Sequence, residues 1–213
     1  ALLQTINAAG IKVLVQACGT HGTPRIIVTQ DGQDDLGLGD KKEVPELNKV
    51  FAVATDVYLS KDCEWTWKER SGANQLTVDA NVASITNEGT LTVNASNIQL
   101  TTAAPLANAK GATMTITKVT TVKNALSNLG TINVGASAEL RAYDVAVTND
   151  ATSLDDYGII NNAGVVGVTY ATTGTLNNYG KIVMESSAAI TLLTSNQTAT
   201  GNFNNAFNAG TNK

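Results

Sequence analysis

The 213-residue chain has few charged residues, two cysteines, a single histidine and no long apolar run. Asp, Glu, Lys and Arg make up 15% of the sequence, whereas about 25% is usual for globular proteins. With 43% hydrophobic residues and a net charge of −4, the composition excludes disorder driven by charge. The shortage of Lys and Arg argues against binding to nucleic acid, which requires clustered cations. Because no apolar run reaches about 18 residues, no segment is expected to span a membrane.

Histidine and cysteine are too scarce for most metal and nucleophile sites. The single His21 excludes a site with several histidine ligands and disfavours a Ser-His-Asp arrangement. Two cysteines cannot build a four-cysteine zinc site. Cys18 and Cys63 could form one disulfide, which would stabilise the fold by a few kcal/mol and indicate an oxidising compartment, or they could remain thiols.

The charges that are present divide the chain into two regions. Of the 32 charged residues (14 Lys and Arg with 18 Asp and Glu), 19 lie in residues 1–79 and 13 in residues 80–213. A polar, turn-like stretch at 71–74 precedes a strand signal. We therefore predict a β-rich N-terminal segment or cap over residues 1–75 and a second region over 76–213. In the first region we expect strands at 11–15, 25–29, 50–59 and 64–68.

A phrase recurs in the second region: an apolar residue, a spacer, Asn, any residue, Gly, and then two apolar residues in alternation. One complete copy is Ile85-Thr-Asn87-Glu-Gly89-Thr-Leu91-Thr-Val93. The Asn position is occupied by Asn87, Asn128, Asn162, Asn178 and, in a truncated copy, Asn208. The Gly position is occupied by Gly89, Gly130, Gly164, Gly180 and Gly210. A degenerate copy lies at Asn108.

The spacing of the phrase indicates a stacked repeat. The Asn residues at 87, 108, 128, 162, 178 and 208 are separated by 21, 20, 34, 16 and 30 residues. If each of the two large gaps contains one degenerate copy, at Asn149 and Ser195, the period is about 15–21 residues, which is typical of a solenoid. Because the last copy is incomplete, we expect the chain to be a segment of a longer one.

The residues of the phrase suit a tight corner between strands. The corner between Asn and Gly is expected to need left-handed backbone angles, which Asn tolerates and Gly adopts freely. An Asn at the same corner of every turn can bond to the amide of the next. The alternating residues that follow, such as Leu91 and Val93, would point into one core. We predict an all-β fold, a right-handed parallel β-helix with a short β-rich N-terminal capping segment; an antiparallel sandwich is the alternative.

The phrases at Asn87, Asn128, Asn162 and Asn178 resemble those of right-handed parallel β-helix proteins on bacterial surfaces. Examples are filamentous-haemagglutinin-like adhesins, autotransporter passenger domains and the β-helical adhesins of Bacteroides-type gut bacteria. The resemblance covers about residues 76–213 and does not extend to residues 1–75. It implies a secreted or surface-displayed protein that binds host or matrix components, and it brings no catalytic motif.

Enzymes also use parallel β-helices, and their sites need converging carboxylates. The best candidates are Glu139, Arg141, Asp144, Asp150, Asp155 and Asp156, which could gather at one loop and hold Ca²⁺ or could form a solvated loop. Trp65 and Trp67 share one strand face, and the core of a small β domain is favoured over a sugar platform.

We therefore expect a non-catalytic structural or adhesion protein, with no cofactor and no metal, at the cell surface or outside the cell. Its partner would be a glycan or a protein on a host or neighbouring cell, bound through an exposed Thr/Asn face and loop insertions. A homo-oligomer or a larger parent chain is compatible with this prediction. The alternatives are a polysaccharide lyase or hydrolase built on a β-helix, and a virion fibre protein.

Overall fold

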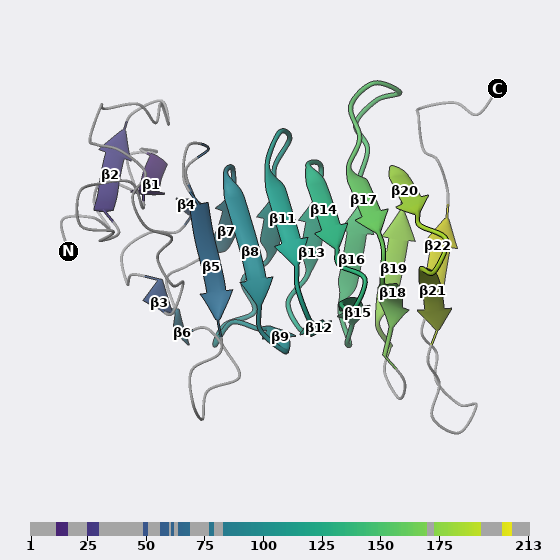
Figure 1. Ribbon diagram of the computed structural model, residues 1–213. Helices are drawn as coiled ribbons and strands as arrows, with labels where there is room; N and C mark the ends of the chain where they lie inside the picture. Colours follow the sequence, from purple (N-terminus) through teal and green to yellow (C-terminus); the bar gives the residue numbers. More distant parts are fainter. Residues whose placement is uncertain are drawn as a thin grey trace.

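The computed structural model describes residues 83–169 and 173–192, together with Lys61 and seven separate strands. Those strands are β1 (Lys12–Gln16), β2 (Arg25–Thr29), β3 (Lys49–Val50), β4 (Asp56–Leu59), β5 (Glu64–Lys68), β6 (Thr77–Val78) and β22 (Asn202–Asn205). All regular elements in the described residues are β-strands, which confirms the all-β prediction (Figure 1). Among these residues there is no helix of the length and apolar character needed to cross a bilayer.

The described chain winds through five successive turns, each of which contributes one strand to each of three sheets. In order, the turns are β7 (Ser84–Asn87), β8 (Thr90–Asn94) and β9 (Asn97–Ile98); β10 (Leu106–Asn108), β11 (Thr113–Ile116) and β12 (Val119–Val122); β13 (Leu126–Asn128), β14 (Thr131–Val134) and β15 (Glu139–Ala142); β16 (Ala146–Asn149), β17 (Ile159–Asn162) and β18 (Val165–Val168); β19 (Thr175–Asn178), β20 (Lys181–Met184) and β21 (Ala189–Leu192).

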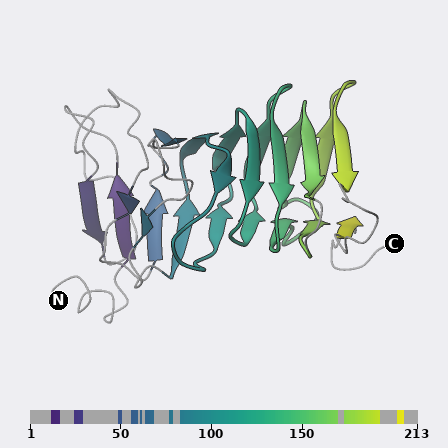
Figure 2. The same ribbon diagram turned by 90° about the horizontal axis from the view of Figure 1, so that it is seen from below.

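In the five turns each strand pairs in parallel with the strand three places along the chain, so the three sheets run side by side along the molecule (Figures 1 and 2). The nine-stranded sheet has the order β2-β1-β4-β7-β10-β13-β16-β19-β22. The six-stranded sheet runs β20-β17-β14-β11-β8-β5, and the five-stranded sheet runs β21-β18-β15-β12-β9. This is a parallel β-solenoid, as predicted, and the antiparallel sandwich is excluded.

The parallel stacking extends to the N-terminal side of residue 76. β4 pairs with β7 and β5 pairs with β8, both in parallel. β1 then pairs in parallel with β4, and β2 pairs with β1 in the antiparallel direction. The strands expected at 25–29 and 64–68 coincide with β2 and β5. The parallel pairing therefore continues across residue 75, where the composition changes.

The core is built from columns of apolar side chains that lie in register from turn to turn. In the six-stranded sheet, one inward column consists of Trp65, Leu91, Met114, Ile132, Ile160 and Ile182. Burial alternates along the strands because successive side chains point to opposite faces of a sheet. Trp65 and Trp67 are 1% and 3% exposed, so they belong to the core, as favoured from the sequence.

One corner of the solenoid carries a continuous ladder of asparagine side chains, all of them buried except the last, Asn205. In each step an Asn Nδ2 donates to the Oδ1 of the Asn in the next turn, at distances of 2.7–2.8 Å. The ladder runs through Asn87, Asn108, Asn128, Asn149, Asn178 and Asn205. Asn87, Asn108, Asn128 and Asn149 also donate to backbone carbonyl groups in the following turn, for example from Asn108 to Thr131.

The ladder gives the length of each turn directly. Its first three steps span 21, 20 and 21 residues, and the last two span 29 and 27. Asn149, expected as a degenerate copy, is a member of the ladder. β19 pairs directly with β22, so no turn lies between Asn178 and Asn205; Ser195 itself is outside the described residues. The first large gap therefore contains the expected extra copy, whereas the stack passes from β19 to β22 across the second gap without one.

Asn162 lies at a different corner from the ladder. It ends β17, so it stands where the chain passes from the six-stranded to the five-stranded sheet, in register with Val134 and Met184. Its Oδ1 accepts from the Gly164 amide at 3.1 Å, and its Nδ2 donates to the Ala189 carbonyl at 2.9 Å. The sequence phrase therefore occurs at two corners of the solenoid. Only at the ladder corner does its asparagine recur in successive turns.

The glycines of the phrase are needed for close packing between turns. The expectation that they adopt left-handed backbone angles is wrong. In the described residues, positive φ angles occur at Gly111 and Asp144. The φ angles of Gly130, Gly164 and Gly180 lie outside this left-handed region. A Cβ at Gly130 would overlap the carbonyl oxygens of Ala109 and Ala112 in the preceding turn. The backbones of stacked corners approach so closely that there is no room for a side chain.

Replacing Asn128 with alanine should destabilise the fold by about 2–4 kcal/mol. The change removes the acceptor of Asn108 and the donor to Asn149, and each buried polar atom left unpaired costs about 1–3 kcal/mol. Urea unfolding followed by circular dichroism measures the loss. The matched control is Asn133→Ala, which removes an exposed bond from Asn161 and should cost less than about 1 kcal/mol. Equal losses in the two variants would contradict a special role of the ladder.

Gly130→Ala should cost at least about 1–3 kcal/mol, because the added methyl group meets backbone carbonyls that cannot move independently. Gly135→Ala is the control, since the nearest atom to its added Cβ is the Ile116 carbonyl oxygen at 3.5 Å. We expect Gly135→Ala to change stability by less than about 0.5 kcal/mol. Thermal unfolding of both variants tests this, and a Gly130→Ala protein as stable as the parent would disprove the packing explanation.

Candidate binding face

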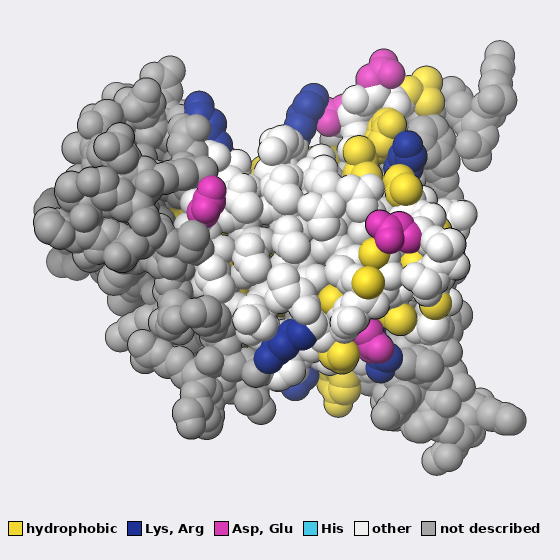
Figure 3. Space-filling view, in the orientation of Figure 1, with side chains coloured by type: hydrophobic (Ala, Val, Ile, Leu, Met, Phe, Trp, Pro, Cys, Tyr) yellow, Lys and Arg dark blue, Asp and Glu magenta, His cyan; other side chains and the backbone are white. Residues whose placement is uncertain are grey.

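The outward side of the six-stranded sheet carries small, uncharged polar side chains. Since inward positions of these strands are apolar, the alternate positions face outward and are mostly threonine and asparagine. We call these residues the Thr/Asn face: Thr90, Thr92, Thr113, Thr115, Thr131, Asn133 and Asn161. Figure 3 shows a broad neutral area over β8, β11 and β14.

Strand register arranges the Thr/Asn face in two straight columns. Thr90, Thr113 and Thr131 align in one column, and Thr92, Thr115, Asn133 and Asn161 align in the other. Neighbouring strands are about 4.8 Å apart and alternate residues of a strand about 6.6 Å apart. The hydroxyl and amide groups therefore form a nearly planar grid. Asn161 Nδ2 donates to Asn133 Oδ1 at 2.9 Å, which orients these two amides.

The chemistry available on this face is hydrogen bonding. Each threonine hydroxyl offers one donor and two acceptor positions, and each asparagine amide offers both kinds of group. None of the seven side chains titrates near neutral pH. Charged residues occur at the borders, with Glu64 in the first strand of the sheet and Lys181 in the last. The arrangement suits a neutral polar ligand or the backbone and polar groups of another protein.

An insertion between β16 and β17 forms a short hairpin over residues 150–158, which projects beyond the end of the strands (Figure 1). Ala151 and Tyr157 form an antiparallel bridge. The amides of Thr152 and Ser153 donate to the Asp156 carbonyl at 2.8 and 3.2 Å. Leu154, at the tip, is 63% exposed. The hairpin is thus held in one shape by its own backbone bonds.

An ion pair ties the 150–158 hairpin to an earlier turn. Lys110 Nζ, at the corner between β10 and β11, lies 3.1 Å from Asp156 Oδ2. Hydrogen bonds from Lys110 and, to a smaller extent, from the Thr152 hydroxyl hold the pKa of Asp156 below its ordinary value. Because both partners are accessible to solvent, the pair orients the hairpin more than it stabilises the whole fold.

The acidic residues proposed for catalysis or Ca²⁺ do not converge on one point. Asp144 lies before β16, where its Oδ1 accepts from the Thr173 amide at 2.9 Å, whereas the hairpin with Asp150, Asp155 and Asp156 follows the other end of that strand. Glu139 and Arg141 form an ion pair on the outward side of β15. Within the described residues, no group of three or more His, Cys, Asp or Glu side chains is placed to hold a metal ion.

The predicted turn residues are distributed over two corners. Asn87, Asn128 and Asn178 lie in the ladder, and Asn162 with Gly164 lies at the next corner. The carbonyl oxygen of Gly89 accepts a hydrogen bond from Asn87 Nδ2, and the carbonyl oxygen of Gly130 accepts one from Asn128 Nδ2. Gly180 follows Asn178 at the ladder corner and donates its amide to the Asn149 carbonyl at 3.1 Å. Asn208, Gly210, Cys18 and Cys63 lie outside the described residues, so the disulfide stays a prediction.

Two asparagines with structural roles, Asn205 and the buried Asn124, were not singled out from the sequence. Asn205 ends the described ladder, and the signal for it is the apolar residue two places earlier, Phe203, which matches Leu176 before Asn178. Asn124 accepts from the Leu100 amide at 2.8 Å and donates to the carbonyls of Thr102 and Ala104. It therefore fixes the connection between β9 and β10. No repeated phrase marks Asn124, so the sequence holds no comparable signal.

Comparisons of the chain with protein-family models, with curated proteins and with solved structures found no match. The functional argument therefore depends on the architecture and on the side chains that its faces display.

Lys110→Met should raise the pKa of Asp156 towards the ordinary value of an aspartate, since the main group that lowers it is removed. A carboxyl-detected NMR titration measures this pKa in both proteins. Because the pKa of Asp156 is lowered, the ion pair between Lys110 and the hairpin should be fully formed at pH values above the ordinary pKa of an aspartate. It should be lost when the pH falls through the lowered pKa of Asp156. An unchanged Asp156 titration in the variant would contradict the ion pair.

Proposed function

We propose that the protein is a non-catalytic structural and adhesive segment, displayed at a cell surface or outside the cell, whose Thr/Asn face binds a glycan or a protein. The observation that carries the proposal is the alignment of seven neutral polar side chains in two columns on one sheet. Glycan recognition relies on many hydrogen bonds to neutral hydroxyl groups, and this grid supplies donors and acceptors at regular spacing.

The stacked architecture supports a mechanical part of this function. Parallel sheets run along the whole described length, and the Asn ladder links the turns through their side chains. Each turn contacts its neighbours on both sides, so the outward columns keep their spacing without a ligand. A preformed grid loses little conformational entropy on binding.

The first experiment is a glycan array combined with a polysaccharide-turnover assay on the same purified chain. We expect binding without turnover. The test variant is Thr113→Val with Thr115→Val, which removes two hydroxyl groups from the Thr/Asn face while it preserves side-chain shape. It should weaken binding by about tenfold or more, because a lost hydrogen bond to a neutral partner costs about 0.5–1.5 kcal/mol and two are removed.

The control is Thr86→Val with Thr175→Val, on the outward side of the nine-stranded sheet. It carries the same chemical change on a different face, and we expect it to bind as the parent does. Equal loss in both variants would contradict a role of the Thr/Asn face. Turnover of a polysaccharide would overturn the non-catalytic proposal, and failure to bind any glycan or matrix protein would overturn its adhesive part.

A further inference from the structure

β20 is the last strand of the six-stranded sheet, and its outer edge has no partner strand among the described residues (Figure 1). The strand and the residue that follows it read Lys181-Ile-Val-Met-Glu185. Val183 and Met184 are 38% and 42% exposed. Backbone donors and acceptors along such an edge form a template for pairing with another strand.

Two hydrogen bonds show which backbone groups of β20 point to this outer edge. The amide of Lys181 donates to the carbonyl just before β17 at 3.0 Å, and the amide of Glu185 donates to the last carbonyl of β17 at 2.9 Å. In a parallel pair, alternate residues of a strand direct their backbone groups to the same neighbour. The amides and carbonyls of Ile182 and Met184 therefore point away from β17, towards the outer edge.

The segment 181–185 is complementary to a second copy of itself in the antiparallel direction. If two β20 strands cross at Val183, Lys181 of each copy lies opposite Glu185 of the other, and opposite charges directly across two strands stabilise the pairing. Ile182 of each copy then lies opposite Met184 of the other, so that the backbone groups at the outer edge meet in hydrogen-bonded pairs. The two Val183 residues form a non-hydrogen-bonded pair, in which side chains come closest.

Other alignments of the same two edges lack this match. Parallel pairing in register would set Lys181 against Lys181 and Glu185 against Glu185, and like charges in this position are destabilising. An antiparallel slip by one residue would turn the outward side chains of one copy to the inner side of the other. Neither Lys181 nor Glu185 forms an ion pair with another described residue. A lysine usually protects an exposed edge from pairing, and in this register a glutamate of the second copy offsets it.

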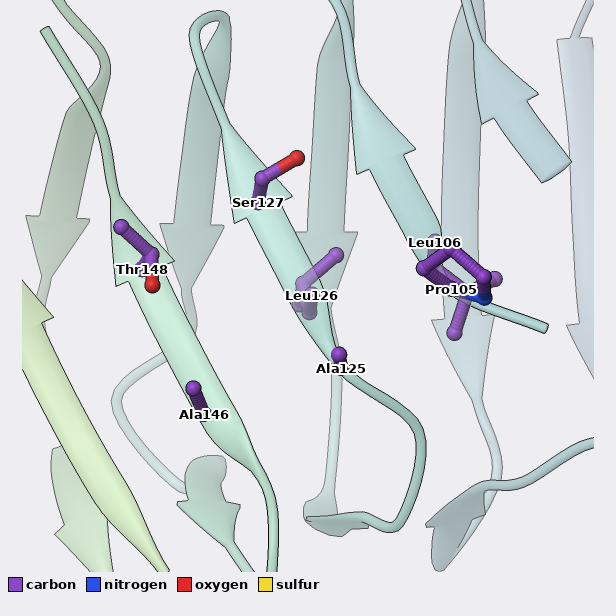
Figure 4. Close-up of a pocket in the computed structure, with 7 residues that line it drawn as sticks. All are labelled: Pro105, Leu106, Ala125, Leu126, Ser127, Ala146 and Thr148. Carbon is purple, nitrogen blue, oxygen red and sulfur yellow. The ribbon is translucent and has the colours of Figure 1, made fainter. Parts of the chain in front are cut away.

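The outer edge of β20 differs from the shallow depression on the outward side of the nine-stranded sheet (Figure 4). That depression lies over β10, β13 and β16, which are interior strands that already pair on both sides. Its lining residues are uncharged. The depression therefore presents neutral side chains, whereas the edge of β20 combines backbone donors and acceptors with a charge of each sign.

We propose that two copies of this chain form a dimer by antiparallel pairing of their β20 strands about a two-fold axis at Val183. The same five residues of each copy meet, so the contact is isologous and association ends at the dimer. β22 extends the nine-stranded sheet by one strand at this end, so the two solenoids meet at an angle that leaves room for both β22 strands. The proposal goes beyond the adhesive function and does not depend on it, because the pairing uses the edge of the sheet and not the Thr/Asn face.

Sedimentation velocity over a wide range of protein concentration tests the proposal. We expect an equilibrium between monomer and dimer, with the dimer formed at high concentration because the contact is small. Glu185→Lys should raise the midpoint concentration by about tenfold or more, since each dimer would then oppose lysine to Lys181 twice. The control is Asp155→Lys, which makes the same change of charge at an exposed position of the 150–158 hairpin and should leave the midpoint unchanged.

Two further variants test the register and the backbone pairing. Lys181→Glu combined with Glu185→Lys restores opposite charges across the strands, so this double variant should dimerise as the parent does. Met184→Pro removes a backbone donor that faces the second copy and should weaken dimerisation as strongly as Glu185→Lys does. Circular dichroism should show an intact fold in Met184→Pro, because the lost amide does not bond to β17. A chain that is monomeric at all concentrations, a mass that grows beyond the dimer, or a double variant as weak as Glu185→Lys would overturn the proposal.

Discussion

The structure depends on the bonding of each turn to the turns on either side of it. Within the sheets this is the usual parallel pairing of backbone groups. At the ladder corner the asparagine amides continue the same pattern. Asn108 accepts from Asn87 and donates to Asn128 and to the Thr131 carbonyl, so its polar atoms are partnered although the side chain is 1% exposed. A buried amide without such partners would be costly. The ladder is therefore stable only as a repeat, and it requires that every turn bring an asparagine to the same height.

This requirement explains where the sequence is constrained and where it is free. Inward columns must be apolar, and Gly130 must lack a side chain, because carbonyl groups of the previous turn occupy that space. The number of residues in a turn is less constrained. The fourth turn spans 29 residues instead of 20 or 21, yet Asn149 and Asn178 are joined at 2.7 Å. The additional residues leave the stack outward, partly as the 150–158 hairpin. Insertions of this kind change the surface without disturbing the column of amides beneath.

The sequence predicted the architecture because the repeated phrase contains the physical requirements of a corner, an inward apolar residue and a polar amide that can stack. It could not assign each copy to its corner. Ile160-Asn-Asn162 and Val147-Thr-Asn149 both have an apolar residue two places before the asparagine. The glycine that belongs to the second copy, Gly158, comes later in the sequence because the hairpin intervenes. What assigns Asn149 to the ladder is its separation of 21 residues from Asn128. A constant turn of 20–21 residues selects Asn149, but that constancy is visible only when the insertion is known. The reason for the glycines was also hidden, since close approach between turns is a property of the stack and not of one turn.

The neutral character of the outer surface follows from the same bonding. A stack whose turns are joined by backbone groups and corner amides needs no charged residues to hold its turns together, and the outward positions of β8, β11 and β14 are accordingly threonine and asparagine. One pair of charges lies at a corner and an insertion, where Lys110 meets Asp156. A ligand on the Thr/Asn face would therefore be selected by the spacing of hydroxyl and amide groups.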